Sequence, residues 1–204
     1  MELREALTQI TEIRLHLART EVFRGYRAMP VAFSGGIALL AALVQAVTIT
    51  DPATQMGPYL ILWVGAALVS ALAAGLEMMI RARNSSSPMT RELTWLALEQ
   101  FFPSLLAGAL VTVVLFRFAS GSLWMLPGLW QIFFGLGIFA SWRLLPRPTF
   151  WVAVFYVGTG LAVLTLAQGE ASLSPWAMGL PFGTGQFLAA FILYRTLERN
   201  HAGV

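Results

Sequence analysis

The sequence contains no cysteine and no lysine, and each absence removes a class of chemistry. Without cysteine there is no disulfide framework, no thiolate metal ligand and no thiol nucleophile. All thirteen basic residues are arginine, so no side-chain amine is present to form a Schiff base. Redox chemistry on protein sulfur is therefore limited to methionine.

Charge is also scarce: only 11% of the residues are charged, whereas 57% are hydrophobic. A water-soluble domain is normally about a quarter charged. The apolar residues come in blocks of about twenty, which is the length of helix that crosses a hydrocarbon layer of about 30 Å. The composition therefore predicts an all-α, polytopic membrane protein in which the helices form one bundle.

Six apolar blocks predict six transmembrane helices within a single domain that covers residues 28–204. Before them, residues 1–27 place Leu3, Leu7 and Ile10 at steps of three and four, which predicts an amphipathic cytoplasmic helix. That helix would lie at the inner membrane interface, pack on the cytoplasmic ends of the bundle, or bind a partner helix. The predicted spans are about 30–49, 58–80, 95–116, 123–142, 149–167 and 175–194.

The distribution of arginine predicts the orientation of the chain. Twelve of the thirteen arginines fall on one side of the predicted spans, and only Arg117 falls on the other. Short loops rich in arginine stay in the cytoplasm, so we expect both termini inside, in the multi-pass topology of a cytoplasmic (cell) membrane protein. Because this topology explains the positive charge, the lipid bilayer is the expected partner and nucleic acid is not.

Small residues recur at every fourth position of the first two spans, where they allow two helix backbones to approach closely. We interpret these ladders as the seam of the first hairpin, with a homo-oligomer or another membrane protein as the alternative partner. They consist of Ser34, Ala38, Ala42 and Ala46, followed by Ala67, Ala71 and Gly75.

A candidate polar site inside the membrane consists of Glu77, Glu99, Gln100, Pro103 and Gln186. The two carboxylates are predicted at similar depth, and Pro103 removes the hydrogen bond that the Glu99 carbonyl would accept. Interrupted helices and intramembrane carboxylates are typical of transport sites. In the alternative interpretation both carboxylates are interfacial and have no function.

Two further sets of residues complete the candidate sites. Gln45 and Gln131 would extend a cavity if they face inward. Arg24, Tyr26 and Arg27, just before the first span, suit anionic lipid headgroups.

The remaining residues do not form a catalytic motif. His16 and His201 are the only histidines, and neither has a neighbour at metal-ligand spacing. No phosphate-binding loop or nucleophile elbow is present, so we expect neither a metal nor a cofactor, and no enzyme activity. The sequence favours a non-enzymatic accessory, sensory or assembly protein that acts through helix contacts. The alternative is a small transporter or permease subunit that uses Glu99 and Glu77 and the broken sixth span.

Overall fold

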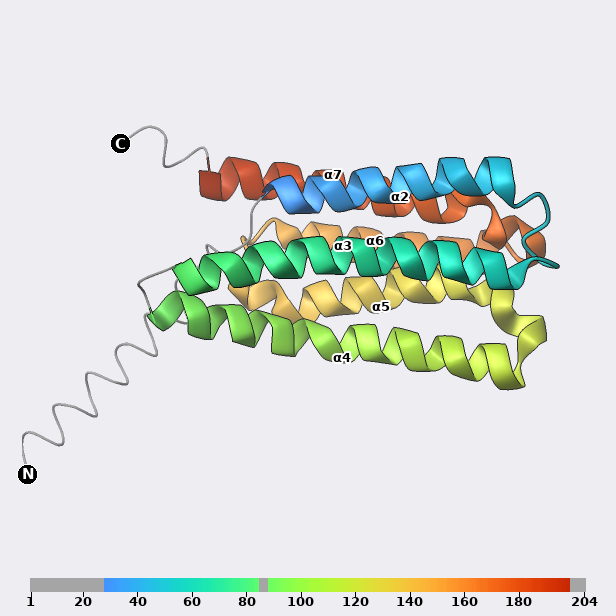
Figure 1. Ribbon diagram of the computed structural model, residues 1–204, viewed down its shortest axis with the longest axis horizontal. Helices are drawn as coiled ribbons and strands as arrows, with labels where there is room; N and C mark the ends of the chain where they lie inside the picture. Colours follow the sequence, from blue (N-terminus) through green and yellow to red (C-terminus); the bar gives the residue numbers. More distant parts are fainter. Residues whose placement is uncertain (1–27, 85–87, 199–204) are drawn as a thin grey trace, which may run out of the picture.

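The computed structural model describes residues 28–84 and 88–198, and the regular structure within these ranges is helical (Figure 1). The predicted amphipathic helix of residues 1–27, and with it Arg24, Tyr26 and Arg27, lies outside the described residues. In the described part, six helices, some together with an adjoining turn, are long and apolar enough to cross a membrane.

The helices follow one another with short connections. The long ones are α2 (Ala28–Thr48), α3 (Met56–Asn84), α4 (Pro88–Phe118), α5 (Leu126–Ser141), α6 (Thr149–Leu166) and α7 (Pro175–Leu193). Short turns flank them: the 3-10 turns η1 (Ser120–Met125), η2 (Trp142–Leu144) and η3 (Gly169–Leu173), and the π-helical turn η4 (Tyr194–Glu198).

Proline and short polar residues set the boundaries of these helices. Pro127 and Pro175 stand in the first turns of α5 and α7, where a missing N–H does no harm. Between α2 and α3, the Asp51 carboxylate accepts hydrogen bonds from the Thr54 hydroxyl at 2.7 Å and the Ala53 N–H at 3.1 Å. These bonds, chiefly the one from Thr54, hold the pKa of Asp51 below its usual value.

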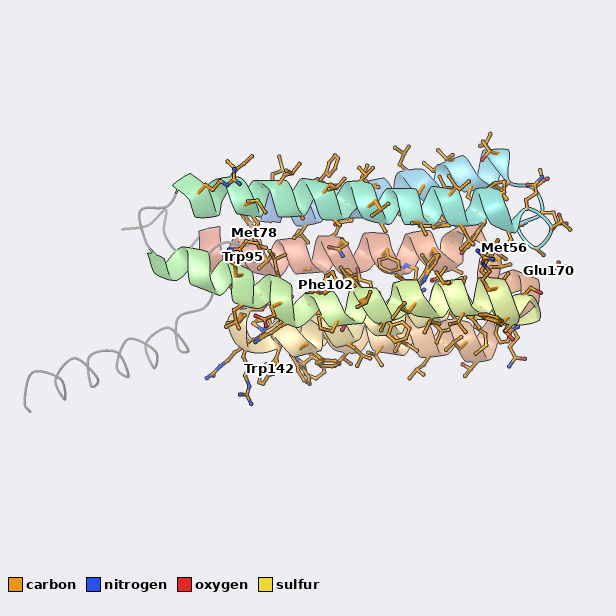
Figure 2. The ribbon with its side chains drawn as sticks, turned by 60° about the horizontal axis from the view of Figure 1, so that its bottom comes forward. Met56, Met78, Trp95, Phe102, Trp142 and Glu170 are labelled. Carbon is orange, nitrogen blue, oxygen red and sulfur yellow. The ribbon has the colours of Figure 1, made fainter. Side chains whose placement is uncertain are left out.

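The long helices lie side by side, with consecutive helices running in opposite directions (Figure 1). We call the end at which η1, η3 and the α2–α3 connection gather the η1–η3 end, and the opposite end the η2 end. Met56 and Glu170 lie at the η1–η3 end, whereas Met78, Trp95 and Trp142 lie toward the η2 end (Figure 2).

The first and last long helices, α2 and α7, form a very close seam because glycine on one helix faces alanine or glycine on the other. A Cβ atom on Gly179 would collide with the Cβ of Ala42, and one on Gly35 would lie 3.1 Å from the Cβ of Gln186. Such contacts are a main source of helix association where apolar burial gains little.

This seam corrects the predicted role of the small-residue ladders. Ala38 and Ala42 are buried, but they pack against Gly179 of α7. On α3, by contrast, Ala67 and Ala71 are exposed, and a Cβ on Gly75 would meet nothing within 4 Å. The prediction that both ladders form the seam of the first hairpin is therefore wrong: the α2 ladder serves α7, and the α3 ladder faces outward.

A second seam joins α5 and α6 through glycines that face each other. A Cβ on Gly160 would lie 2.6 Å from the Gly128 carbonyl oxygen. A Cβ on Gly128 would lie 2.7 Å from the Gly160 carbonyl oxygen. Farther along, a Cβ on Gly135 would lie 3.0 Å from the Ala153 carbonyl oxygen. Side chains larger than hydrogen would push the two helices apart.

Aromatic rings fill the middle of the molecule between these seams. The Phe134 ring lies 4.9 Å from Tyr156, 5.3 Å from Phe101 and 5.5 Å from Phe182, measured between centroids. Edge-to-face arrangements of this kind stabilise a core beyond the area that they bury. This cluster links α4, α5, α6 and α7.

Helices α3 and α4 contribute least to the interior. Only 11% of the apolar stretch of α3 and 6% of that of α4 is buried, against 28–39% for the other four helices. Their outer faces carry large apolar side chains such as Ile61, Leu72, Phe102 and Val113. We call this outward surface the α3–α4 face.

Candidate functional site

The structure distributes the predicted polar site over different helices. Glu77 lies on α3 and is half-buried, while Glu99 and Pro103 are exposed on α4. Gln186 is buried on α7, where its side chain packs against Gly35 and is a hydrogen-bonding neighbour of the Tyr156 hydroxyl. The polar contact of Gln186 is thus made with α6 and not with the carboxylates.

The two carboxylates are associated with the same end of the molecule. Met78, which follows Glu77, packs in one buried cluster with Ala97 and Leu144, and Glu99 lies two residues beyond Ala97. Glu77 takes part in a polar interaction, whereas no described residue hydrogen-bonds or pairs with the Glu99 carboxylate. The similar membrane depth of the two carboxylates stays a prediction.

Gln100 is the half-buried neighbour of Glu99, and its Oε1 atom has no hydrogen-bond partner among the described residues. One turn farther along α4, Pro103 lacks the N–H that would bond the Glu99 carbonyl. This part of α4 therefore offers several hydrogen-bond acceptors close together.

A more completely built polar cluster lies at the η1–η3 end, around the buried side chain of Gln45. Gln45 Nε2 donates to the Leu173 carbonyl at 2.7 Å, and Gln45 Oε1 accepts from the Trp63 indole N–H at 2.7 Å. Because one partner can only accept and the other can only donate, the orientation of the amide is fixed. A single side chain thereby joins α2, α3 and η3.

Gln131 of α5 donates a hydrogen bond to the backbone of α7 where Pro181 interrupts the helical hydrogen bonds. Pro181 has no N–H, so the carbonyl of Ala177, four residues earlier, loses its partner within the helix. Gln131 Nε2 donates to that carbonyl at 2.9 Å. The carbonyl that the proline of the sixth span leaves without a helical partner thus receives a hydrogen bond from a side chain of a neighbouring helix.

Two hydroxyl groups extend these contacts along α7 and the turns before it. The Ser172 hydroxyl lies 2.5 Å from the Trp124 carbonyl oxygen and 2.7 Å from that of Gly169, which brings η3 against η1. The Tyr156 hydroxyl donates to the Phe182 carbonyl at 3.3 Å. Polar side chains from α2, α5 and α6 thus meet the chain between Leu173 and Phe182.

We refer to Gln45, Tyr59, Trp63, Gln131 and Ser172 as the η1–η3 polar cluster. Its groups are amide, phenol, indole and hydroxyl, all of them uncharged at neutral pH. Among the described residues, no group of three histidine, cysteine, aspartate or glutamate side chains could hold a metal ion. The cluster suits neutral hydrogen bonding, and it contains no carboxylate for proton or cation transfer.

The sequence identified only part of this cluster. Gln45 and Gln131 stand out as amides inside apolar spans, and the sequence already marked them as extensions of a polar site. Trp63, Tyr59 and Ser172 carry no comparable signal, because aromatic and small polar residues are common near helix ends. Their role depends on contacts between distant segments.

Comparison with known proteins adds no relative: no family model, no curated protein and no solved structure matches the chain. The class is therefore defined by the fold alone. It is an all-helical protein with six helices compatible with a membrane protein.

Proposed function

We propose that this protein is a non-enzymatic, multi-pass protein of the cytoplasmic membrane, with both termini inside, that acts as an accessory or assembly subunit. Its working surface is the α3–α4 face, which packs against transmembrane helices of a partner. The observation that carries this proposal is the unequal burial of the helices: 11% for α3 and 6% for α4, against at least 28% for the rest.

The α3 ladder supports the same surface. Inside the molecule, small residues at this spacing bring α2 and α7 into contact, as at Ala42 and Gly179. On α3 the ladder of Ala67, Ala71 and Gly75 has the same spacing but faces outward. Small residues favour close approach of another helix more than they favour contact with lipid tails.

Glu99 adds a polar feature to this face. Its carboxylate is exposed on α4 and has no partner among the described residues. Intramembrane carboxylates are costly unless paired. A partner helix with an arginine, lysine or other hydrogen-bond donor near the inner leaflet would complement it.

The natural absence of cysteine makes a direct test available. We expect Ala71→Cys, labelled in native membranes with a short thiol-reactive photo-cross-linker, to be cross-linked to a partner, whereas Leu161→Cys, exposed on α6, is not. In a second variant the cysteine is placed at position 68 (Leu68→Cys). Adding Ala71→Leu to that variant should abolish its cross-link, because the larger side chain blocks close approach of the partner helix. Equal capture from α3 and α6, or no effect of Ala71→Leu, would contradict the proposal.

The runner-up is a small transporter or permease subunit. It is favoured by the buried Oε1 of Gln100, which has no described partner and stands beside Glu99 and the Pro103 break. In this case Glu99→Gln should lower proton-coupled flux in proteoliposomes by at least tenfold, since the amide cannot carry a proton. Flux equal to that of the unaltered protein would remove Glu99 from the proposal.

A further inference from the structure

The connection between α5 and α6 combines positive charge with large aromatic rings. It consists of η2 and the four residues that precede Thr149. Residues 142–151 contain two arginines, two tryptophans and one phenylalanine, and they contain no acidic residue. Trp142 lies toward the η2 end (Figure 2), which the distribution of arginine predicts to be the cytoplasmic end.

The inner side of the α5–α6 connection is anchored in the bundle. Leu144 is buried in one cluster with Met78 of α3 and Ala97 of α4. The buried Thr149 hydroxyl donates to the Pro146 carbonyl at 2.6 Å. These contacts hold the connection against the helices from inside.

The outer side carries three exposed aromatic rings in mutual contact, and we call them the aromatic patch. The Phe150 ring centroid lies 6.2 Å from that of Trp142 and 5.5 Å from that of Trp151. Trp142 is 41% exposed, Phe150 38% and Trp151 66%. The patch thus covers the end of α5 and the first turn of α6.

Two arginines border the aromatic patch. Arg143 follows Trp142 within η2, and the Arg147 carbonyl accepts a hydrogen bond from the Phe150 N–H at 3.2 Å. Both arginine side chains are exposed, and neither has an ion-pair or hydrogen-bond partner among the described residues. The N–H groups at the start of α6 bond to carbonyls of the connection, so donors for a ligand come from side chains.

We propose that the α5–α6 connection binds the phosphate group of an anionic phospholipid through Arg143 and Arg147, while the aromatic patch contacts the glycerol and the upper acyl chains. Guanidinium groups match phosphate in charge and in hydrogen-bond geometry. Exposed tryptophan beside them favours a lipid over a soluble anion, because indole rings prefer the headgroup layer. The cytoplasmic leaflet supplies anionic lipid.

This site is separate from the α3–α4 face, and it rests on the proposed function only for the location of the protein in a membrane. Incorporation into lipid nanodiscs distinguishes the two proposals. Protein that enters nanodiscs and shows no preference for anionic lipid would contradict the lipid site alone. Failure to enter nanodiscs would contradict the membrane location, and with it the lipid site.

Lipid binding measured by native mass spectrometry tests the proposal. The protein in detergent is titrated with phosphatidylglycerol and, in parallel, with phosphatidylcholine. Phosphatidylglycerol should bind at least about fivefold more tightly, and Arg143→Gln and Arg147→Gln should each weaken its binding about fivefold. Binding of phosphatidylcholine should change by less than about twofold.

Arg195→Gln is the matched control, because Arg195 is also an exposed arginine toward the η2 end. Its guanidinium carbon lies 5.0 Å from the Phe191 ring centroid on its own helix, so this arginine has a different neighbour. The control should change the binding of phosphatidylglycerol by less than about twofold. A loss as large as that of Arg143→Gln would show a diffuse attraction of charge, and would overturn the proposal.

Two further results would also overturn the proposal. One is unchanged binding of phosphatidylglycerol to the Arg143→Gln/Arg147→Gln double variant. The other is displacement of the lipid by inorganic phosphate at equal concentration, which would assign the site to a soluble anion. We expect no such displacement, because free phosphate makes no contact with the aromatic patch.

Discussion

Gln45 joins three elements with one side chain, and it illustrates how much a single neutral residue can do in an apolar interior. Its amide is bonded at both ends, to the Leu173 carbonyl and the Trp63 indole. Each partner is itself buried within the cluster at the η1–η3 end. In a buried apolar environment, removing one partner of a hydrogen bond is costly because the other polar group stays buried and unpaired.

Replacing Gln45 by leucine should therefore be strongly destabilising although the volume is nearly conserved. The substitution leaves the Trp63 N–H and the Leu173 carbonyl without this partner, so we expect a loss of about 2–4 kcal/mol in the free energy of unfolding. Chemical denaturation in mixed micelles, followed by tryptophan fluorescence, measures it. The control is Gln168→Leu, on an exposed residue, which should change the stability by less than about 0.5 kcal/mol.

At the scale of helices, the seams depend on where the glycines point and not on how many there are. Gly158 and Gly160 stand two residues apart on α6. A Cβ on Gly160 would lie 2.6 Å from the Gly128 carbonyl oxygen and 2.7 Å from the Ile132 side chain, whereas one on Gly158 would meet nothing within 4 Å. The two glycines thus face different surroundings.

This pair predicts opposite outcomes for the same substitution. Gly160→Ala should destabilise the protein by about 1–3 kcal/mol, because α5 and α6 must separate. Gly158→Ala should be neutral or stabilising by up to about 1 kcal/mol, since alanine restricts the unfolded chain. Thermal unfolding in one detergent compares them, and equal effects would show that the α5–α6 seam is not as close as described.

The sequence predicts the helices well and their partners poorly, for a physical reason. Each apolar block of about twenty residues determines its own helix, so the six predicted spans correspond to six long helices. The partner of a helix face depends on residues far away in the chain. The ladder at Ala38 and Ala42 predicts close packing, yet nothing local indicates that Gly179 of α7, and not α3, supplies the other side.

The candidate site shows the same division. Gln45 and Gln131 are recognisable as amides within apolar segments, but their partners are 128 and 46 residues away. The sequence groups Gln186 with Glu77 and Glu99 because all three are polar residues within apolar segments. In the structure Gln186 instead contacts Tyr156 and Gly35, because α7 lies against α6 and α2.

At the scale of the whole molecule, the exposed arginines of the described residues lie mostly at one end of the helices. Arg143, Arg147 and Arg195 are exposed toward the η2 end, while Arg117 closes α4 next to η1. In a bilayer this asymmetry predicts that the η2 end faces the cytoplasm. The predicted orientation therefore depends on arginines in several connections and not on one helix.

Single cysteines test this orientation. In intact cells, an impermeant maleimide should label Ala53→Cys, in the α2–α3 connection, and should reach Arg147→Cys only after the membrane is permeabilised, because arginine-rich connections remain inside. Both positions are exposed. Labelling in the reverse order would show that the protein is inverted.

The close seam between α2 and α7 has a consequence for biosynthesis. A ribosome delivers α2 well before α7, so the Gln45 amide and the small residues of α2 that face α7 remain without their partners while the four helices between them are made. A nascent or truncated chain that ends before Leu173 leaves that amide without its carbonyl in the lipid, and a membrane protease or chaperone that reads unpaired polar groups can distinguish it from the finished protein.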